Sequence, residues 1–115
     1  LIRGQIAYCD FEDVIGRFTW AETSENDTLL YGNLYSGFDD PDINNYSFCL
    51  EDEHDEVMYD LTQNFQKNVK IVGPGITPYQ EDFKNGFMKP STVTGLRFVI
   101  KCKDKTIGDS TIKPI

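Results

Sequence analysis

The chain has very little of the side-chain chemistry from which enzyme sites and metal centres are usually built. Histidine occurs once, as His54, and the three cysteines, Cys9, Cys49 and Cys102, have no spacing typical of a metal site. No apolar run approaches the roughly 20 residues that cross a bilayer, so the sequence predicts no membrane span. Lysine and arginine are absent from Phe18 to Gln66, a stretch that contains twelve acidic residues.

The charge is divided unevenly along the chain. The formal net charge is −8, yet the segment from Lys67 to Ile115 holds nine basic and only four acidic residues. Nucleic acid is disfavoured as a partner, because phosphate binding needs clustered lysine and arginine with aromatic residues between them. An acidic segment of this length is either a solvated face or a surface that attracts a basic protein partner or a cation.

Length and composition predict one folded domain over residues 1–115. The hydrophobic content of 39% and the aromatic content of 13% argue against disorder. Alternating apolar and polar residues, bounded by turn signals, predict short strands at 1–9, 14–22, 28–35, 45–53, 67–72, 92–101 and 106–112. Residues 76–86 are expected to be loop or a weak strand, and residues 57–65 to hold at most one helical turn. This pattern predicts an all-β, antiparallel sandwich or barrel of seven to eight strands.

The segment from Asn45 to Glu53 is the expected centre of any functional site. Its alternation places Tyr46, Phe48 and Leu50 on one face of a strand. The other face carries Ser47, Cys49 and Glu51. An acidic loop with His54 follows, and binding sites of small β proteins often lie where a strand runs into polar loops.

Several segments together resemble the copper/zinc superoxide dismutase family, whose fold is an eight-stranded Greek-key barrel. Ile15-Gly-Arg-Phe-Thr-Trp20 is similar to the family's second strand, and Leu30-Tyr-Gly-Asn-Leu-Tyr-Ser-Gly-Phe38 to its V-x-G-x-[IL]-x-G-L segment. Tyr46-Ser-Phe-Cys-Leu-Glu51 stands where the family carries G-F-H-V-H-E. Thr94-Gly-Leu-Arg-Phe-Val-Ile-Lys101 matches its [IV]-G-R-[ST]-[LIV]-V-V-H strand.

The same resemblance implies that the family's copper ligands are missing. Its histidine pair aligns with Phe48 and Leu50, or with Ser47 and Cys49 if the register shifts by one residue. Its late-strand histidine aligns with Lys101. Copper redox chemistry at such a site requires imidazole ligands. The resemblance also implies a shortened zinc loop. A family disulfide is not expected, because its first cysteine has no counterpart and the second falls near Gly108, where the chain offers Asp109.

A calcium loop is the best remaining candidate for a metal site. Asp40, Asp42, Asn44 and Glu51 offer oxygen ligands at positions 1, 3, 5 and 12 of a calcium-loop pattern. Position 6, which should be glycine, is Asn45. A plain acidic turn is the other interpretation of this segment.

Two further kinds of site involve His54 or exposed tyrosines. Cys49 with His54 would make a nucleophile and base, although no third group is evident to orient the histidine. A protein or carbohydrate contact surface is predicted instead from an exposed tyrosine pair and the acidic loop. Tyrosines packed at the rim of the barrel with solvated hydroxyls are the other interpretation of this pair. The residues of the predicted contact surface are Tyr31, Tyr35, Asp39, Asp52, Glu53, His54 and Asp55.

Two N-glycosylation sequons begin at Asn26 and Asn45 and favour a secreted protein. The sequence thus leads to two hypotheses of function. The first is a non-catalytic, superoxide dismutase-like β-sandwich without a cofactor, which acts outside the cell as a protein-interaction or structural module. The alternative is a calcium-dependent binding domain that uses the acidic loop 39–51.

Overall fold

Two antiparallel sheets form the protein in a computed structural model that describes residues 5–24 and 26–115. The five-stranded sheet has the order β11-β1-β2-β3-β8, and the four-stranded sheet the order β10-β9-β4-β5. The first comprises β1 (Ile6–Phe11), β2 (Gly16–Ser24), β3 (Asp27–Leu34), β8 (Tyr79–Phe83) and β11 (Lys113–Pro114). The second comprises β4 (Tyr46–Glu51), β5 (Val57–Asp60), β9 (Arg97–Cys102) and β10 (Lys105–Thr111).

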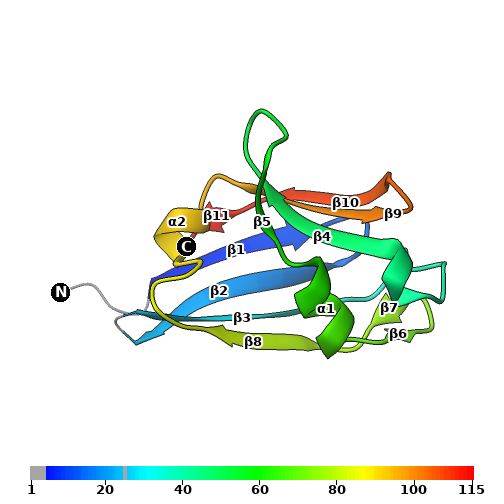
Figure 1. The fold of residues 1–115 in the computed structure, drawn as a ribbon, viewed down its shortest axis with the longest axis horizontal. Coiled ribbons are helices and arrows are strands. Elements are labelled where there is room, and N and C mark those ends of the chain that lie inside the picture. Colours follow the sequence, from blue (N-terminus) through cyan, green and yellow to red (C-terminus); the bar gives the residue numbers. More distant parts are fainter. Residues whose placement is uncertain (1–4, 25) are drawn as a thin grey trace.

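Short elements connect the two sheets. They are the 3-10 helix η1 (Ile43–Asn45), the helices α1 (Thr62–Asn68) and α2 (Pro90–Val93), and the strand pair β6 (Ile71–Val72) and β7 (Gly75–Ile76). Helix α1 follows β5 and packs against β4 and β8, one strand from each sheet (Figure 1). Within the described ranges, none of the helices is long and apolar enough to cross a bilayer.

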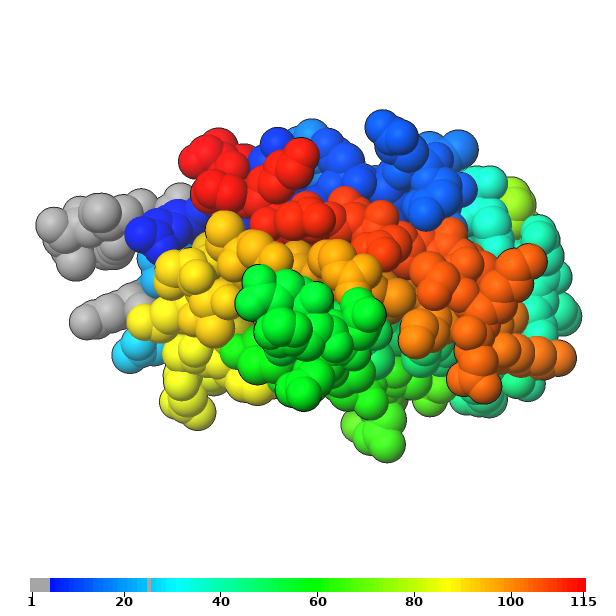
Figure 2. Space-filling view, turned by 90° about the horizontal axis from the view of Figure 1, so that it is seen from above, coloured from blue at the N-terminus to red at the C-terminus, as the bar shows by residue number. Residues whose placement is uncertain are grey.

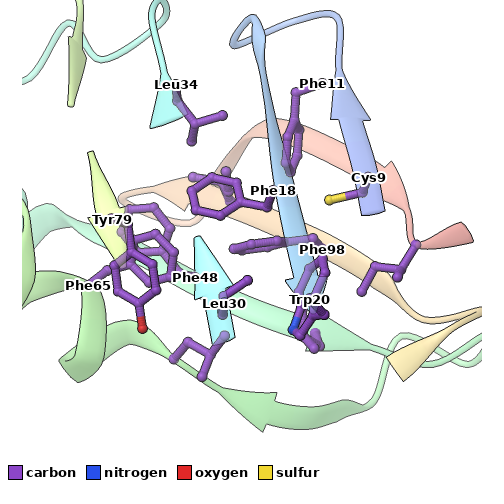
Figure 3. Close-up of a cluster of buried hydrophobic side chains, with 14 of the residues drawn as sticks. Cys9, Phe11, Phe18, Trp20, Leu30, Leu34, Phe48, Phe65, Tyr79 and Phe98 are labelled. Atoms are coloured by element: carbon purple, nitrogen blue, oxygen red, sulfur yellow. The ribbon is translucent and has the colours of Figure 1, made fainter. Parts of the chain in front are cut away.

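Aromatic side chains fill the space between the sheets. Phe65 of α1 stacks on Phe48 with ring centroids 4.1 Å apart and on Tyr79 with centroids 4.0 Å apart. Phe98 packs near the centre of the same cluster, 5.3 Å from Phe18 and 6.0 Å from Trp20 (Figure 3). All six rings are at most 1% exposed, so one aromatic core joins both sheets and α1.

The predicted fold class is confirmed. Within the described residues, eight strands have four or more residues, all the strand pairs are antiparallel, and β4 lies beside β9, which is distant in sequence. Strands predicted at 14–22, 28–35, 45–53 and 106–112 each contain most of an observed strand. The expected first strand is observed from Ile6 and extends to Phe11, while residues 1–4 lie outside the described part of the chain.

The strand predicted at 67–72 is wrong over most of its length. Helix α1 continues to Asn68, and of the residues expected to form the strand only Ile71 and Val72 belong to one, β6. Leu61, Phe65 and Val69 recur every four residues and all three are buried: Phe65 lies within the helix, and Leu61 and Val69 cap its two ends. This helix is longer than the single turn expected within residues 57–65.

One other boundary differs from the sequence prediction, and one alternative that the sequence left open is resolved as a strand. The strand expected at 92–101 begins only at Arg97, because Pro90 starts the short helix α2 in front of it. Residues 79–83, expected to be loop or a weak strand, form β8 and pair with β3 along its length. Tyr79 and Phe83 are buried there, which gives the strand an apolar face despite its charged residues.

Candidate functional site

Strand β4 separates an apolar interior face from a polar exterior face, as the sequence predicted. Tyr46, Phe48 and Leu50 are at most 2% exposed and point into the aromatic core. Ser47 and Cys49 alternate with them and are only half-buried. The strand lies between β9 and β5, so the pairing on both sides fixes which residues face inward.

The positions that the sequence resemblance predicts to align with copper ligands do not lie on one face of this sheet. Phe48 and Leu50 are core residues, whereas Lys101 is the cross-strand partner of Ser47 and therefore shares the outer face with it. In the alternative register, Ser47, Cys49 and Lys101 do share a face. Hydrocarbon, hydroxyl, thiol and ammonium groups thus occupy these positions, and the chain's imidazole is elsewhere.

The acidic segment after β4 forms an ordered hairpin loop. Oδ1 of Asp52 accepts hydrogen bonds from the backbone N–H groups of His54 (2.8 Å) and Glu56 (3.0 Å). The bond from Glu56 is the main cause that lowers the pKa of Asp52. The His54 side chain is 76% exposed, and its Nε2 lies 3.6 Å from Glu53. The loop rises from the sheet into solvent (Figure 1).

Arg97 attaches this loop to the sheet. Its guanidinium forms ion pairs with Asp109 at 2.8 Å, with Glu51 at 3.5 Å, and with Asp55 in the loop. Glu51 is only 6% exposed and lies directly opposite Arg97 in the β4–β9 ladder. Sequence reasoning missed this cluster, because it depends on the register of β4 against β9.

The structure brings together three of the four residues of the predicted calcium loop. Oδ1 of Asp40 accepts from the N–H of Asp42, and Oδ1 of Asp42 accepts from the N–H of Asn44, each at 2.9 Å. Glu51 lies at the other end of β4, with Arg97. The carboxylates of Asp40 and Asp42 therefore stabilise the turn that enters β4, and the first of these bonds is the main cause of the lowered pKa of Asp40.

No group of three or more His, Cys, Asp or Glu side chains with the geometry to hold a metal ion occurs within residues 5–24 and 26–115. This finding concerns the protein side chains alone. It gives the calcium hypothesis no further support.

Cys49 is not placed beside His54. Its Sγ lies 3.6 Å from Oδ1 of Asp60 on the neighbouring strand. Burial first and this carboxylate second raise the pKa of Cys49 to about 11, which favours the thiol over the nucleophilic thiolate. All three cysteines are free.

The residues predicted to form a contact surface lie in separate places. Tyr31 is 41% exposed and belongs to β3 of the five-stranded sheet, whereas the acidic loop belongs to the four-stranded sheet. Tyr35 is 61% exposed and follows β3, and Asp39 lies in the loop before η1. Of these residues, Asp52, Glu53, His54 and Asp55 are contiguous.

The two sequons differ in their surroundings. Asn26 is exposed in the turn between β2 and β3. Asn45 is half-buried, and its side-chain amide donates to Asp40 at 2.9 Å. Glycosylation at either position stays a prediction.

Comparison with known proteins shows the fold. No family model and no curated protein matches the chain. Two solved structures of mutant forms of superoxide dismutase 5 from Candida albicans are similar to it. One has a TM-score of 0.68 and 12% identity, and the match covers 99% of this chain and 94% of that one. The other has a TM-score of 0.62 and 10% identity, and the match covers 96% and 92%. The chain therefore has a superoxide dismutase-like β-sandwich fold.

Proposed function

We propose that this protein is a non-catalytic, superoxide dismutase-like β-sandwich that acts by binding another protein, as an interaction or structural module. The observation that carries the proposal is the surroundings of Phe48 and Leu50. Both side chains are fully buried in the aromatic core, and His54 lies in the solvent-exposed loop beyond the end of β4. A redox copper site needs several imidazoles around one ion, which one exposed histidine does not provide.

A protein partner with a basic surface is supported by the charge of the hairpin loop. Asp52, Glu53, Asp55 and Glu56 follow one another closely, and the side chains of Glu53 and Asp55 are 86% and 77% exposed. Such a concentration of one sign of charge attracts an oppositely charged surface and accelerates its association. The same charge repels nucleic acid.

We further propose that the protein functions outside the cell. The support is the pair of sequons, of which Asn26 is exposed in a turn between strands and accessible to a glycan. Expression in a secreting eukaryotic host should therefore give a chain whose mass falls on treatment with an endoglycosidase. An Asn26→Gln variant should lose that shift.

Metal content and activity test the proposed function. The purified chain, incubated with excess Cu²⁺ and Zn²⁺ and then desalted, is expected to hold far less than one ion per chain by elemental analysis. It should show no dismutase activity. One copper per chain together with superoxide turnover would overturn the proposal.

A calcium titration distinguishes the alternative hypothesis in the same preparation. A ligand that binds only the folded state raises the melting temperature by mass action. Millimolar Ca²⁺ is expected to leave the melting temperature unchanged, because Glu51, the ligand at position 12 of the pattern, lies at the far end of β4 and pairs with Arg97. A rise that is lost in Asp42→Ala would favour the calcium-dependent domain.

A further inference from the structure

The edge strand β5 contains a bulge at Met58. Leu50 pairs with Tyr59 and Glu51 with Val57, so Met58 is the extra residue on the β5 side of the ladder. Bulges on edge strands redirect side chains and prevent edge-to-edge pairing. The Met58 side chain is 52% exposed at this point.

Apolar side chains gather around the bulge. Val57 is 53% exposed, and Phe87, from the segment between β8 and α2, is 47% exposed. Phe87 packs edge-on against Tyr59, with ring centroids 5.3 Å apart. The four residues Val57, Met58, Tyr59 and Phe87 are called the β5 patch below. Tyr59 and Phe87 bring apolar rings from two chain segments into contact, and the exposed residues Val57 and Met58 precede Tyr59 in the same strand.

Acidic residues border the β5 patch. Glu53, Glu56 and Asp60 are exposed along the same hairpin, on both sides of Met58. On the Phe87 segment, the positive charge of Lys84 is already paired, with Asp27 at 3.1 Å and Asp82 at 2.9 Å. Lys89 lies half-buried two residues beyond Phe87. Seen from above, the green hairpin lies between the yellow segment that contains residue 87 and the orange β9 segment (Figure 2).

The hairpin that carries the patch is ordered, because β5 pairs with β4 and Tyr59 packs on Phe87. Asp52 bonds the loop backbone at two positions, and Asp55 is fixed by Arg97. A preformed surface loses little conformational entropy on binding. An apolar centre inside a charged rim is also the usual layout of a protein–protein contact.

We propose that the β5 patch is the docking site for a protein that presents apolar side chains between lysine or arginine residues. This proposal rests on the function proposed above and specifies the partner's chemistry. A second copy of this chain is disfavoured as the occupant, because a two-fold contact at Met58 would place Glu56 and Asp60 of each copy against the same acidic residues of the other.

A short peptide with the partner's chemistry provides the probe. We would titrate the full ¹⁵N-labelled chain with a seven-residue peptide that alternates lysine with leucine, and follow the backbone amide shifts. The largest shifts are expected at residues 53–60 and 87. A peptide that alternates lysine with serine should bind at least tenfold more weakly, and one that alternates glutamate with leucine should not bind.

Two pairs of variants separate the apolar and charged contributions. The double variant Met58→Ser, Phe87→Ser should weaken binding of the lysine–leucine peptide at least tenfold. The control Val72→Ser, which alters a side chain that is 60% exposed outside the patch, should leave binding unchanged. Glu53→Lys with Glu56→Lys should also weaken it at least tenfold, whereas Asp39→Lys should not. All six side chains are exposed, and melting curves would verify that each variant folds.

Several outcomes would overturn the docking proposal. They are equal affinity for the lysine–serine peptide, shifts centred on residues 39–42, and binding that the Met58 and Phe87 substitutions leave unchanged. A dimer in sedimentation runs that these two substitutions dissociate would assign the patch to a second copy instead. Metal content, measured on the same sample, tests the proposed function separately. Bound copper would contradict the proposed function, whereas absence of peptide binding at the patch would contradict only the docking proposal.

Discussion

The two faces of strand β4 belong to different environments, although their residues alternate along six positions. On the inner face, Phe48 stacks on Phe65 and Leu50 is buried in the same core. The outer face ends at Glu51, which pairs with Arg97 and so connects the sheet to the acidic hairpin. The inner face of β4 therefore contributes packing, whereas its outer face contributes polar contacts.

Histidine substitutions on the two faces give the largest expected difference. Phe48→His with Leu50→His should lower the free energy of unfolding by more than about 4 kcal/mol, since both changes remove core packing and bury polar rings. Ser47→His, Cys49→His and Lys101→His together place three imidazoles on the outer face. That triple variant should lose less than about 1.5 kcal/mol and gain Zn²⁺ binding. Urea melts and zinc calorimetry measure both effects.

Copper binding by a folded inner-face variant would contradict the assignment of Phe48 and Leu50 to a packed core. That result would mean that Phe48 and Leu50 occupy a site that remains ready for a metal. Unaltered affinity of the triple variant for Zn²⁺, relative to the parent chain, would contradict the assignment of Ser47, Cys49 and Lys101 to one face.

The ion pairs of the outer face give the next largest effect. Arg97→Met keeps the apolar part of the side chain but leaves Glu51 nearly buried without its partner, which should cost about 2 kcal/mol of unfolding free energy. Arg17→Met is the matched control, because Arg17 pairs with Asp10 where both side chains are more than half exposed. Chemical denaturation should find the control unchanged within error. Equal losses in the two variants would refute the special role of Arg97.

Much of the fold was predictable from alternation, because period-two patterns encode which face of a strand is buried. Tyr46, Phe48 and Leu50 illustrate this directly, as do Leu30 and Leu34 of β3. Helix α1 was predicted only as a single turn within residues 57–65, because Leu61, Phe65 and Val69, at its start, middle and end, are separated by polar residues that gave no strong helical signal. Their four-residue spacing was the available clue.

The candidate sites were harder to predict, because they depend on contacts between distant segments. Arg97 meets Glu51 and Asp55 only in the register of β4 against β9, and Phe87 reaches Tyr59 from another loop. The exposure of Met58 follows from a bulge that the sequence does not mark. Conversely, Glu51 was assigned to a calcium loop by sequence spacing, whereas the extended strand carries it away from Asp40.

Cysteine reactivity distinguishes a packed outer face from an enzyme site. Burial and the neighbouring Asp60 raise the pKa of Cys49 to about 11, so little thiolate is present at neutral pH. Iodoacetamide at pH 8 should label Cys49 roughly tenfold or more slowly than a free cysteine peptide, as read by mass spectrometry. Labelling at the peptide's rate or faster, together with a loss of that rate in His54→Ala, would revive a Cys–His site.

The acidic hairpin gives the smallest expected effect and a definite pH dependence. Hydrogen bonds from Glu56 and His54 lower the pKa of the Asp52 carboxyl in the folded state. Its stabilising effect is therefore present above the unfolded-state pKa of about 3.9 and lost as the pH falls through the lower folded-state value. Asp52→Asn should have a slightly lower melting temperature than the parent chain at pH 7, and the two melting temperatures should converge at low pH. A difference that grows on acidification would contradict this assignment.

Anomalous diffraction from crystals soaked in Cu²⁺ and Zn²⁺ would test the central claim most directly. With Phe48 and Leu50 packed into the core and His54 in solvent, we expect no ordered transition metal against strand β4. A fully occupied metal peak beside Phe48 and Leu50, or beside Ser47, Cys49 and Lys101, would contradict the account.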